Sequence, residues 1–430
     1  MIRIKNTIKS FIDRGGHFVF SSMMVSKVLN FILSLLIVHI LTKETYGNIS
    51  YALSIIMIIL PFSGFGLHHA MLRFGSTEKT VEAKNNMFVS FLKWGLLFSL
   101  IIIIVLFLLS DFITIRLPGS KQFLHLLTPM VIAYFGAEMI FALFRVQKNN
   151  VLFSWGVILR AILVLGLCSV FSIIFGGTGY ALTYALIPLL VMLIMLIPGN
   201  RKYGISQTKR YSLDLKPYVK YGLWVGIGSI ASQLVILLDT IMVGNIIADS
   251  SRLALYKVAT IIPANLLFIP SILLKTDFVY IAENYKKRSF LIKYYKKYLF
   301  IFVVITVAMF AVWFIFSDLI MKMFGSQYID AKPIITILLF MVAMAFLTRI
   351  PLGNILNALG KSPWNTYSNL ILLAINVALN ALMIPKYGLN GAAYATCISV
   401  GISGMINIGL FILYLNKYCD DPDKLSKNNS

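Results

Sequence analysis

Ionisable side chains inside otherwise apolar stretches are the residues of this sequence best suited to chemistry. Four basic residues lie well within long apolar runs: Lys27, Arg160, Lys257 and Arg349. Two acidic residues do so as well, Glu138 and Asp239. A charge in an apolar medium is costly unless it meets water, a partner or a cavity. Each of the six is therefore a candidate for binding an ion or a charged group of a substrate.

Four of these charges have a structural alternative, in which they only neutralise one another. Asp239 and Lys257 are expected at matching depth on neighbouring antiparallel segments, so they form either an ion pair or part of a site. Glu138 and Arg349 hold nearly equivalent positions in the two halves of the chain. They are a second possible pair, across the halves.

Lys27 and Arg160 have no acidic residue at their expected depth. We interpret them as the lining of a cavity rather than as structural charges. Such a cavity attracts an anionic group, and the guanidinium of Arg suits phosphate through its bidentate fork.

The elements that position these side chains are predicted to be membrane-spanning helices. Of the 430 residues, 59% are hydrophobic and only 13% are charged, too few charges to cover a water-facing surface. Uninterrupted apolar runs of about 20 residues indicate helices rather than a barrel. Twelve such spans are expected, at residues 16–41, 46–70, 87–109, 122–144, 151–174, 178–198, 218–247, 253–276, 298–320, 333–356, 364–384 and 389–415.

The distribution of Lys and Arg predicts the orientation of these spans. With the N-terminus inside, the basic residues concentrate in the inner connections and are sparse in the outer ones, which is the positive-inside pattern. Both termini and the central basic segment are then cytoplasmic. The net charge of +22 is explained by topology and contacts with anionic lipid heads, so no nucleic-acid partner is expected. The basic N-terminus is read as preceding an uncleaved first helix, not as part of a signal peptide.

An internal repeat divides the chain into two halves. The segment from Gly176 to Tyr184 resembles the segment from Gly388 to Thr396, at an offset of 212 residues that also superimposes the two sets of six spans. Because each half has an even number of spans, the repeats are parallel, about an axis along the membrane normal. The sequence thus predicts an all-α membrane protein of about twelve transmembrane helices in two six-helix bundles (1–198 and 218–415). A cytoplasmic linker (199–217) joins them, and a cytoplasmic tail (416–430) follows.

Motifs of enzymes and of metal or nucleotide sites are missing from the sequence. It has no GxxxxGK[ST], HExxH or GxSxG segment, and its three cysteines, expected to be free thiols, have no metal-ligand spacing. His39, His68 and His69 are expected near the outer ends of the first two spans and are interpreted as interfacial. We therefore predict a carrier and no enzyme, with no metal and no cofactor.

Short motifs in a fixed order make the chain similar to a known family. They are Tyr46–Gly47, Gly64–Leu67 with Arg73, Asp239–Gly244, Tyr256–Ala259 and, most specifically, Ile384–Thr396. In these the sequence resembles the polysaccharide-transport branch of the multidrug/oligosaccharidyl-lipid/polysaccharide exporter superfamily, the O-antigen repeat-unit flippases. Twelve spans distinguish it from the fourteen-helix lipid II flippases.

The resemblance implies a V-shaped cavity between two bundles that opens alternately to the two faces of the cytoplasmic (inner) membrane. It implies an undecaprenyl-pyrophosphate-linked oligosaccharide as substrate, such as an O-antigen or capsule repeat unit, with polysaccharide polymerase and chain-length proteins as possible partners. A basic cavity lined by Lys27, Arg160, Lys257 and Arg349 is compatible with it. A proton or sodium gradient would drive return, with Asp239 or Glu138 as coupling carboxylate. A multidrug exporter of the same superfamily and a membrane polysaccharide polymerase are the alternatives.

Overall fold

The protein is described by a computed structural model at residues 16–207, 213–231 and 234–419, and this part of the chain is helical without any β-strand. The basic N-terminal residues, the middle of the predicted linker and the end of the predicted tail lie outside the described residues. By internal contacts the chain divides into two compact units. The first contains Met1–Leu237 with Ala248–Ala254, and the second contains Leu238–Ile247 with Leu255–Ser430.

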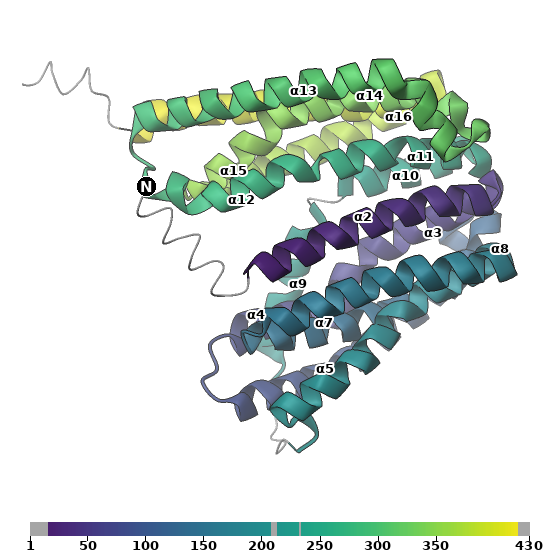
Figure 1. Ribbon diagram of the computed structural model, residues 1–430, viewed down its shortest axis with the longest axis vertical. Helices are drawn as coiled ribbons and strands as arrows, with labels where there is room; N and C mark the ends of the chain where they lie inside the picture. Colours follow the sequence, from purple (N-terminus) through teal and green to yellow (C-terminus); the bar gives the residue numbers. More distant parts are fainter. Residues whose placement is uncertain (1–15, 208–212, 232–233, 420–430) are drawn as a thin grey trace, which may run out of the picture. The chain divides into compact units, whose positions relative to one another are not determined.

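The helices of the first unit run up to α9. They are α2 (Gly16–Ile40), α3 (Lys43–Ile59), η1 (Leu60–Gly66), α4 (Leu67–Gly75), α5 (Val81–Ile113), η2 (Pro118–Ser120), α6 (Lys121–Leu127), α7 (Met130–Val146), α8 (Asn150–Tyr203), η3 (Ile205–Gln207) and α9 (Lys216–Ala231). Both α2 and α7 pack along α8 (Figure 1). Helix α9 packs against η1 and α4.

The second unit is built mainly from the helices that follow. They are α10 (Leu234–Ile247), α11 (Ser250–Leu266), α12 (Phe268–Glu283), α13 (Arg288–Phe324), η4 (Ser326–Ala331), α14 (Lys332–Met344), the π-helical turn η5 (Ala345–Arg349), α15 (Ile350–Ala358) and α16 (Ser362–Tyr418). Helices α14 and α15 both pack on α16, the longest helix of the chain.

Nine of the described helical segments are long and apolar enough to cross a membrane. Two of them, α8 with 54 residues and α16 with 57, are far longer than the roughly 20 residues of one crossing. Each contains one glycine in a left-handed, non-helical conformation, Gly176 (φ 60°) in α8 and Gly388 (φ 59°) in α16. These glycines lie where the sequence predicts the fifth span to end and, in the second half, the eleventh. The all-α membrane fold is confirmed, and the number of helices agrees roughly with the twelve predicted spans.

At both glycines the chain folds back on itself. A Cβ added to Gly179 would lie 2.1 Å from the carbonyl oxygen of Phe171, and one added to Gly391 would lie 2.1 Å from that of Met383. Eight residues of straight helix would separate such groups by about 12 Å, so the contact requires a hairpin. Gly391 follows Gly179 by the 212 residues of the sequence repeat, as Gly388 follows Gly176. The repeat is therefore present in the backbone of both units.

Replacing Gly391 by Ala is expected to lower the melting temperature of the protein purified in detergent. The new Cβ collides with the Met383 carbonyl, and overpacking of this kind costs about 1–3 kcal/mol. Gly409 is the matched control on the same helix, because a Cβ there meets no atom within 4 Å. Gly409→Ala should stabilise the helix by up to about 1 kcal/mol. Equal melting temperatures for the two variants would contradict the tight hairpin.

Candidate functional site

Arg160 does have an acidic partner, contrary to the prediction from its depth. Its Nη1 donates to Oε1 of Glu138 at 3.2 Å, and its guanidinium lies 5.5 Å from the ring centroid of Phe141. The predicted depths of Glu138 and Arg160 in the membrane were counted from two different loop residues, so the two depths were not directly comparable. Counted from the ends of α7 and α8 at their shared turn, Glu138 and Arg160 differ by about one half-turn, which long side chains bridge easily. Within the second unit, the Arg349 guanidinium donates to Asn369.

Lys27 lies on α2, which packs along α8, the helix of Arg160. Its side chain is exposed on the surface of the first unit. Both cations predicted to line a cavity thus belong to neighbouring helices of one unit.

Asp239 is the most deeply buried charged group of the second unit, with 2% of its surface exposed. Asn376 and Asn380 donate to its Oδ1 at 3.1 and 2.6 Å, Tyr256 donates to its Oδ2 at 3.2 Å, and the hydroxyl of Thr396 also donates to Oδ2. Asp239 lies on α10, and its donors come from α11 and from the two parts of α16 that precede and follow Gly388. The carboxylate of Asp239 is thus hydrogen-bonded to three other helical segments, namely α11 and the two parts of α16.

The predicted ion pair of Asp239 with Lys257 is not formed. Among the described residues, neither side chain has an oppositely charged partner within ion-pair distance. Tyr256, the residue next to Lys257 on α11, occupies the place beside Asp239. Successive helical residues point about 100° apart, so Lys257 is directed elsewhere and stays partly exposed.

Four neutral donors occupy both oxygens of the Asp239 carboxylate, and no described cation pairs with it. Its surroundings are also rich in oxygen, and the Oδ1 atom of Asn380 is buried without a hydrogen-bond partner. Carboxylate, hydroxyl and amide oxygens are the ligands that hard cations prefer. The arrangement is suited to a proton or a small cation. The sequence motifs contain Asp239, Tyr256 and Thr396 but do not show that these side chains meet, because the sequence does not reveal which faces of the helices pack together.

Arg349 ends the π-helical turn η5, two residues before Pro351. The N–H of Ile350 bonds to the carbonyl of Ala345, five residues back. Proline has no N–H for the carbonyl of Leu347, and the hydroxyl of Tyr295 donates to this oxygen instead, at 2.9 Å. Tyr295, which lies on another helix, thereby stabilises the turn. The turn itself fixes the direction of the Arg349 side chain.

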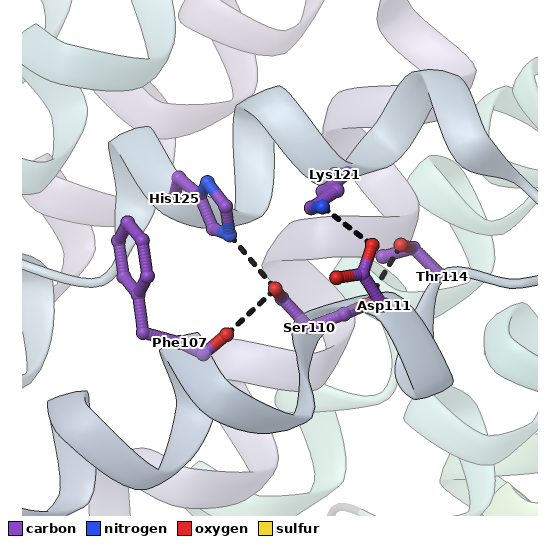
Figure 2. A network of polar contacts seen from close by, with 6 residues as sticks. All are labelled: Phe107, Ser110, Asp111, Thr114, Lys121 and His125. Atoms are coloured by element: carbon purple, nitrogen blue, oxygen red, sulfur yellow. Dashed lines mark hydrogen bonds and ion pairs between the residues drawn. The ribbon is translucent and has the colours of Figure 1, made fainter.

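A further polar cluster, not anticipated from the sequence, joins the end of α5 to the start of α6 (Figure 2). His125 stacks on Phe107 with 3.9 Å between ring centroids, its Nε2 lies 2.9 Å from Ser110 Oγ, and Lys121 pairs with Asp111. The second unit has a similar link between α13 and α14, in which Lys332 pairs with Asp318 at 2.7 Å. Because the link recurs in both units and is exposed, we assign it a structural role.

The two histidines that follow η1, His68 and His69, lie next to each other at the start of α4. His68 is buried, with 4% of its surface exposed, and its ring lies 3.9 Å from that of His69 and edge-on to Phe135. Both histidines lie in the first turn of α4, within the longer helical segment Lys43–Gly75. The three cysteines are free, as predicted.

Solved structures of the same fold are membrane transporters. They include the lipid II flippase MurJ in an inward-closed conformation (TM-score 0.69, 14% identity, 94% of this chain and 93% of that chain covered). They also include a multidrug resistance transporter of the MATE family in an inward-facing conformation (TM-score 0.69, 15% identity, 91% and 94% covered). The latter is assigned to the MOP superfamily, the exporter superfamily that the sequence motifs indicated. The chain thus has the fold of these multi-pass membrane transporters.

The sequence model of the family described as "Polysaccharide biosynthesis protein" matches residues 13–276, more than half of the chain. The chain belongs to this family, the polysaccharide-transport branch of the superfamily. It is similar to an uncharacterized membrane protein of Methanocaldococcus jannaschii (24% identity, 92% of this chain and 82% of that protein). It is also similar to a putative O-antigen transporter of Shigella flexneri (27% identity over 188 residues). That match covers 43% of this chain and 44% of the transporter.

The ion pair of Glu138 and Arg160 is expected to behave as a unit in stability measurements. Glu138→Gln and Arg160→Gln should each lower the free energy of unfolding by about 2 kcal/mol, between the values of exposed and fully buried pairs. The double variant should lose clearly less than the sum of the two. Asp318→Asn, which breaks a largely exposed pair, is the control and should leave the melting temperature unchanged. Strict additivity of the two single variants would show that the pair is not coupled.

Proposed function

We propose that the protein is a flippase for an undecaprenyl-pyrophosphate-linked oligosaccharide, such as an O-antigen or capsule repeat unit. Membership of the polysaccharide-transport branch supports a lipid-linked saccharide as substrate. The observation that carries the proposal is the excess of positive charge inside the membrane segments. Four basic side chains are counted there against two carboxylates, of which Glu138 is paired and Asp239 is enclosed by neutral donors.

In the proposed mechanism the basic side chains hold the pyrophosphate while the isoprenoid chain stays in the bilayer. The two halves alternate between access from the cytoplasmic leaflet and access from the outer leaflet of the inner membrane, with both termini in the cytoplasm. Arg160 and Arg349 offer forked N–H groups for phosphate oxygens, and Lys27 and Lys257 add point charges. A polysaccharide polymerase and chain-length proteins are the partners proposed to take up the product.

Asp239 is proposed as the coupling carboxylate, in preference to Glu138. The charge of Glu138 is already balanced by Arg160. Asp239 has no cationic partner among the described residues, and its neighbours offer the oxygen atoms that a proton or a sodium ion needs. An ion bound at this site would link α10 to the two parts of α16, before and after Gly388. The gradient of that ion would then drive return of the carrier.

Loss of the cation at position 160 is expected to abolish export of the glycan. The test variant combines Arg160→Gln with Glu138→Gln, so that no unpaired carboxylate remains, and adds Lys27→Ala. In a strain lacking the chromosomal gene, surface glycan should fall at least about tenfold at equal protein level in the membrane, a loss of about 1.4 kcal/mol or more. Glu138→Gln alone keeps both cations and should retain most of the export.

Unchanged surface glycan in the triple variant would contradict the basic cavity. A normal glycan in the deletion strain, together with resistance to cationic drugs on expression, would favour a multidrug exporter instead. Such an exporter would be expected to place carboxylates rather than bases along the path of its substrate.

Asp239→Asn is expected to remove the dependence of transport on an ion gradient. In proteoliposomes with a fluorescent lipid-linked oligosaccharide, an imposed sodium or proton gradient should accelerate flipping by the wild type. The asparagine keeps the size of the side chain but not its charge, so the variant should flip equally fast with and without a gradient. Asp277→Asn is the control, because that carboxylate accepts from Tyr294 and lies outside the Asp239 cluster. Retained acceleration in Asp239→Asn would exclude this residue as the coupling group.

A further inference from the structure

An apolar groove with a volume of about 470 Å³ runs along the surface of the α8 hairpin in the first unit. One wall comes from the part of α8 before Gly176 and the other from the part after it. The side chains of each wall lie four residues apart, so they form a ridge along one face of a helix. The two ridges consist of Leu167, Phe171 and Phe175 and of Leu182, Leu186 and Leu190.

The groove has the dimensions of a single hydrocarbon chain. Each ridge is about 12 Å long, which is most of the roughly 15 Å of hydrocarbon in one leaflet of a bilayer. Spread over this length, the volume corresponds to a channel about 6 Å wide. A helix is about 10–12 Å across, so a helix of a partner protein does not fit between the ridges.

The lining of the groove suits hydrocarbon rather than water. The described residues that line it include no ionisable side chain, and their polar side chains are Thr178 and Thr183. The hydroxyl of Thr178 already donates to the carbonyl of Phe175. Beside the groove, Ile173 and Ile174 are 70% and 62% exposed. The groove is therefore part of the surface that faces the bilayer, where leaving it empty would forfeit dispersion contacts.

A polar cavity of about 600 Å³ adjoins the end of the groove at which α8 folds back. Gln122 of this cavity and Leu126 of the groove are one turn apart on α6. A Cβ added to Gly177 would lie 3.1 Å from the ring of Phe123, so the fold of α8 lies against α6. Lys121 also lines the cavity, and its ion pair (Figure 2) uses one of three ammonium donors.

We propose that the α8 groove binds one acyl chain of a bilayer phospholipid, whose headgroup phosphate accepts from Lys121 and Gln122. Such a lipid would contact both parts of α8 and also α6, and it would thereby stabilise the hairpin. Phospholipids far outnumber lipid-linked substrates in a membrane, so mass action favours them. A straight acyl chain also fits the narrow channel better than an isoprenoid chain, which carries a methyl branch on every unit. The site is separate from the substrate and ion sites proposed above and does not depend on them.

Photocrosslinking with a lipid probe tests the groove. The full-length protein is reconstituted in nanodiscs of phosphatidylcholine that contain phosphatidylglycerol with a diazirine in one acyl chain, and labelled peptides are mapped by mass spectrometry. Labelling of the two ridges should exceed that of Ile162 and Leu193, equally exposed residues of α8 that do not line the groove, at least about fivefold. Equal labelling of all exposed faces of α8 would overturn the proposal.

Leu186→Trp fills the groove with a protein side chain. Leu186 is 40% exposed, so the indole should occupy the space of the acyl chain without disturbing the core, and ridge labelling should fall at least about fivefold. Leu182→Trp, on the same ridge, is a second filling variant, and melting temperatures measured without added lipid verify folding. Leu193→Trp is the matched control and should leave labelling within about twofold. Unchanged labelling in both filling variants would contradict the proposal.

The headgroup contact is tested at Gln122, whose side chain is exposed and takes no part in the ion pair of Lys121 with Asp111. Gln122→Leu removes a donor to the phosphate and should lower labelling of the groove at least about threefold, as expected for the loss of one hydrogen bond. Unchanged labelling would overturn the placement of the headgroup at α6.

Competing lipids identify the occupant. Excess unlabelled phosphatidylglycerol with long acyl chains should displace the probe, whereas phosphatidylglycerol with chains too short to follow the ridges should not. Displacement by undecaprenyl phosphate but not by the phospholipid would assign the groove to an isoprenoid chain and overturn the proposal. A dimer of the wild type that dissociates in Leu186→Trp would assign the groove to a second copy of the chain and would overturn it as well.

Discussion

The absence of water from the hydrocarbon core is the constraint on which this structure depends. Every backbone group left free by a break in a helix must find a partner inside the protein. The N–H of Gly64, in the irregular turn η1, donates to the hydroxyl of Ser99 at 2.9 Å. The carbonyl of Leu347, left free by Pro351, accepts from Tyr295. Breaks in the spans are therefore tolerated only where a polar side chain of a neighbouring helix reaches them.

The same constraint applies to the charged side chains, and the protein meets it in three ways. Arg160 is neutralised by Glu138, Asp239 is surrounded by neutral donors, and Arg349 has one amide acceptor. These solutions differ in what they leave open. In the ion pair the two charges balance each other, and Arg160 uses only its Nη1 atom in the bond to Glu138. The charges of Asp239 and Arg349 are oriented by neutral groups, and no described residue of opposite charge pairs with either.

The sequence predicts the helices well and the contacts of their side chains poorly. Span length and hydropathy locate the helices, and the offset of 212 residues locates both hairpin glycines, because these properties depend on the local chain alone. The partners of Arg160 and Asp239 depend in addition on which faces of the helices meet. A shift of one residue replaces Lys257 by Tyr256 beside Asp239. Depth counted along one helix does not contain that rotational information.

The repeat shows how the two units came to hold different charges on a similar backbone. Subtracting 212 from Asp239 gives Lys27, and subtracting it from Asn376, Asn380 and Thr396 gives Val164, Cys168 and Tyr184. The positions that form the carboxylate cluster in the second unit therefore carry a cation and mainly apolar side chains in the first. One backbone scaffold, used twice, thus carries a carboxylate with its donors at these positions of the second unit and a lysine with mainly apolar neighbours at the matching positions of the first. The repeat therefore fixes the backbone of the two units but not the charge that each places at equivalent positions.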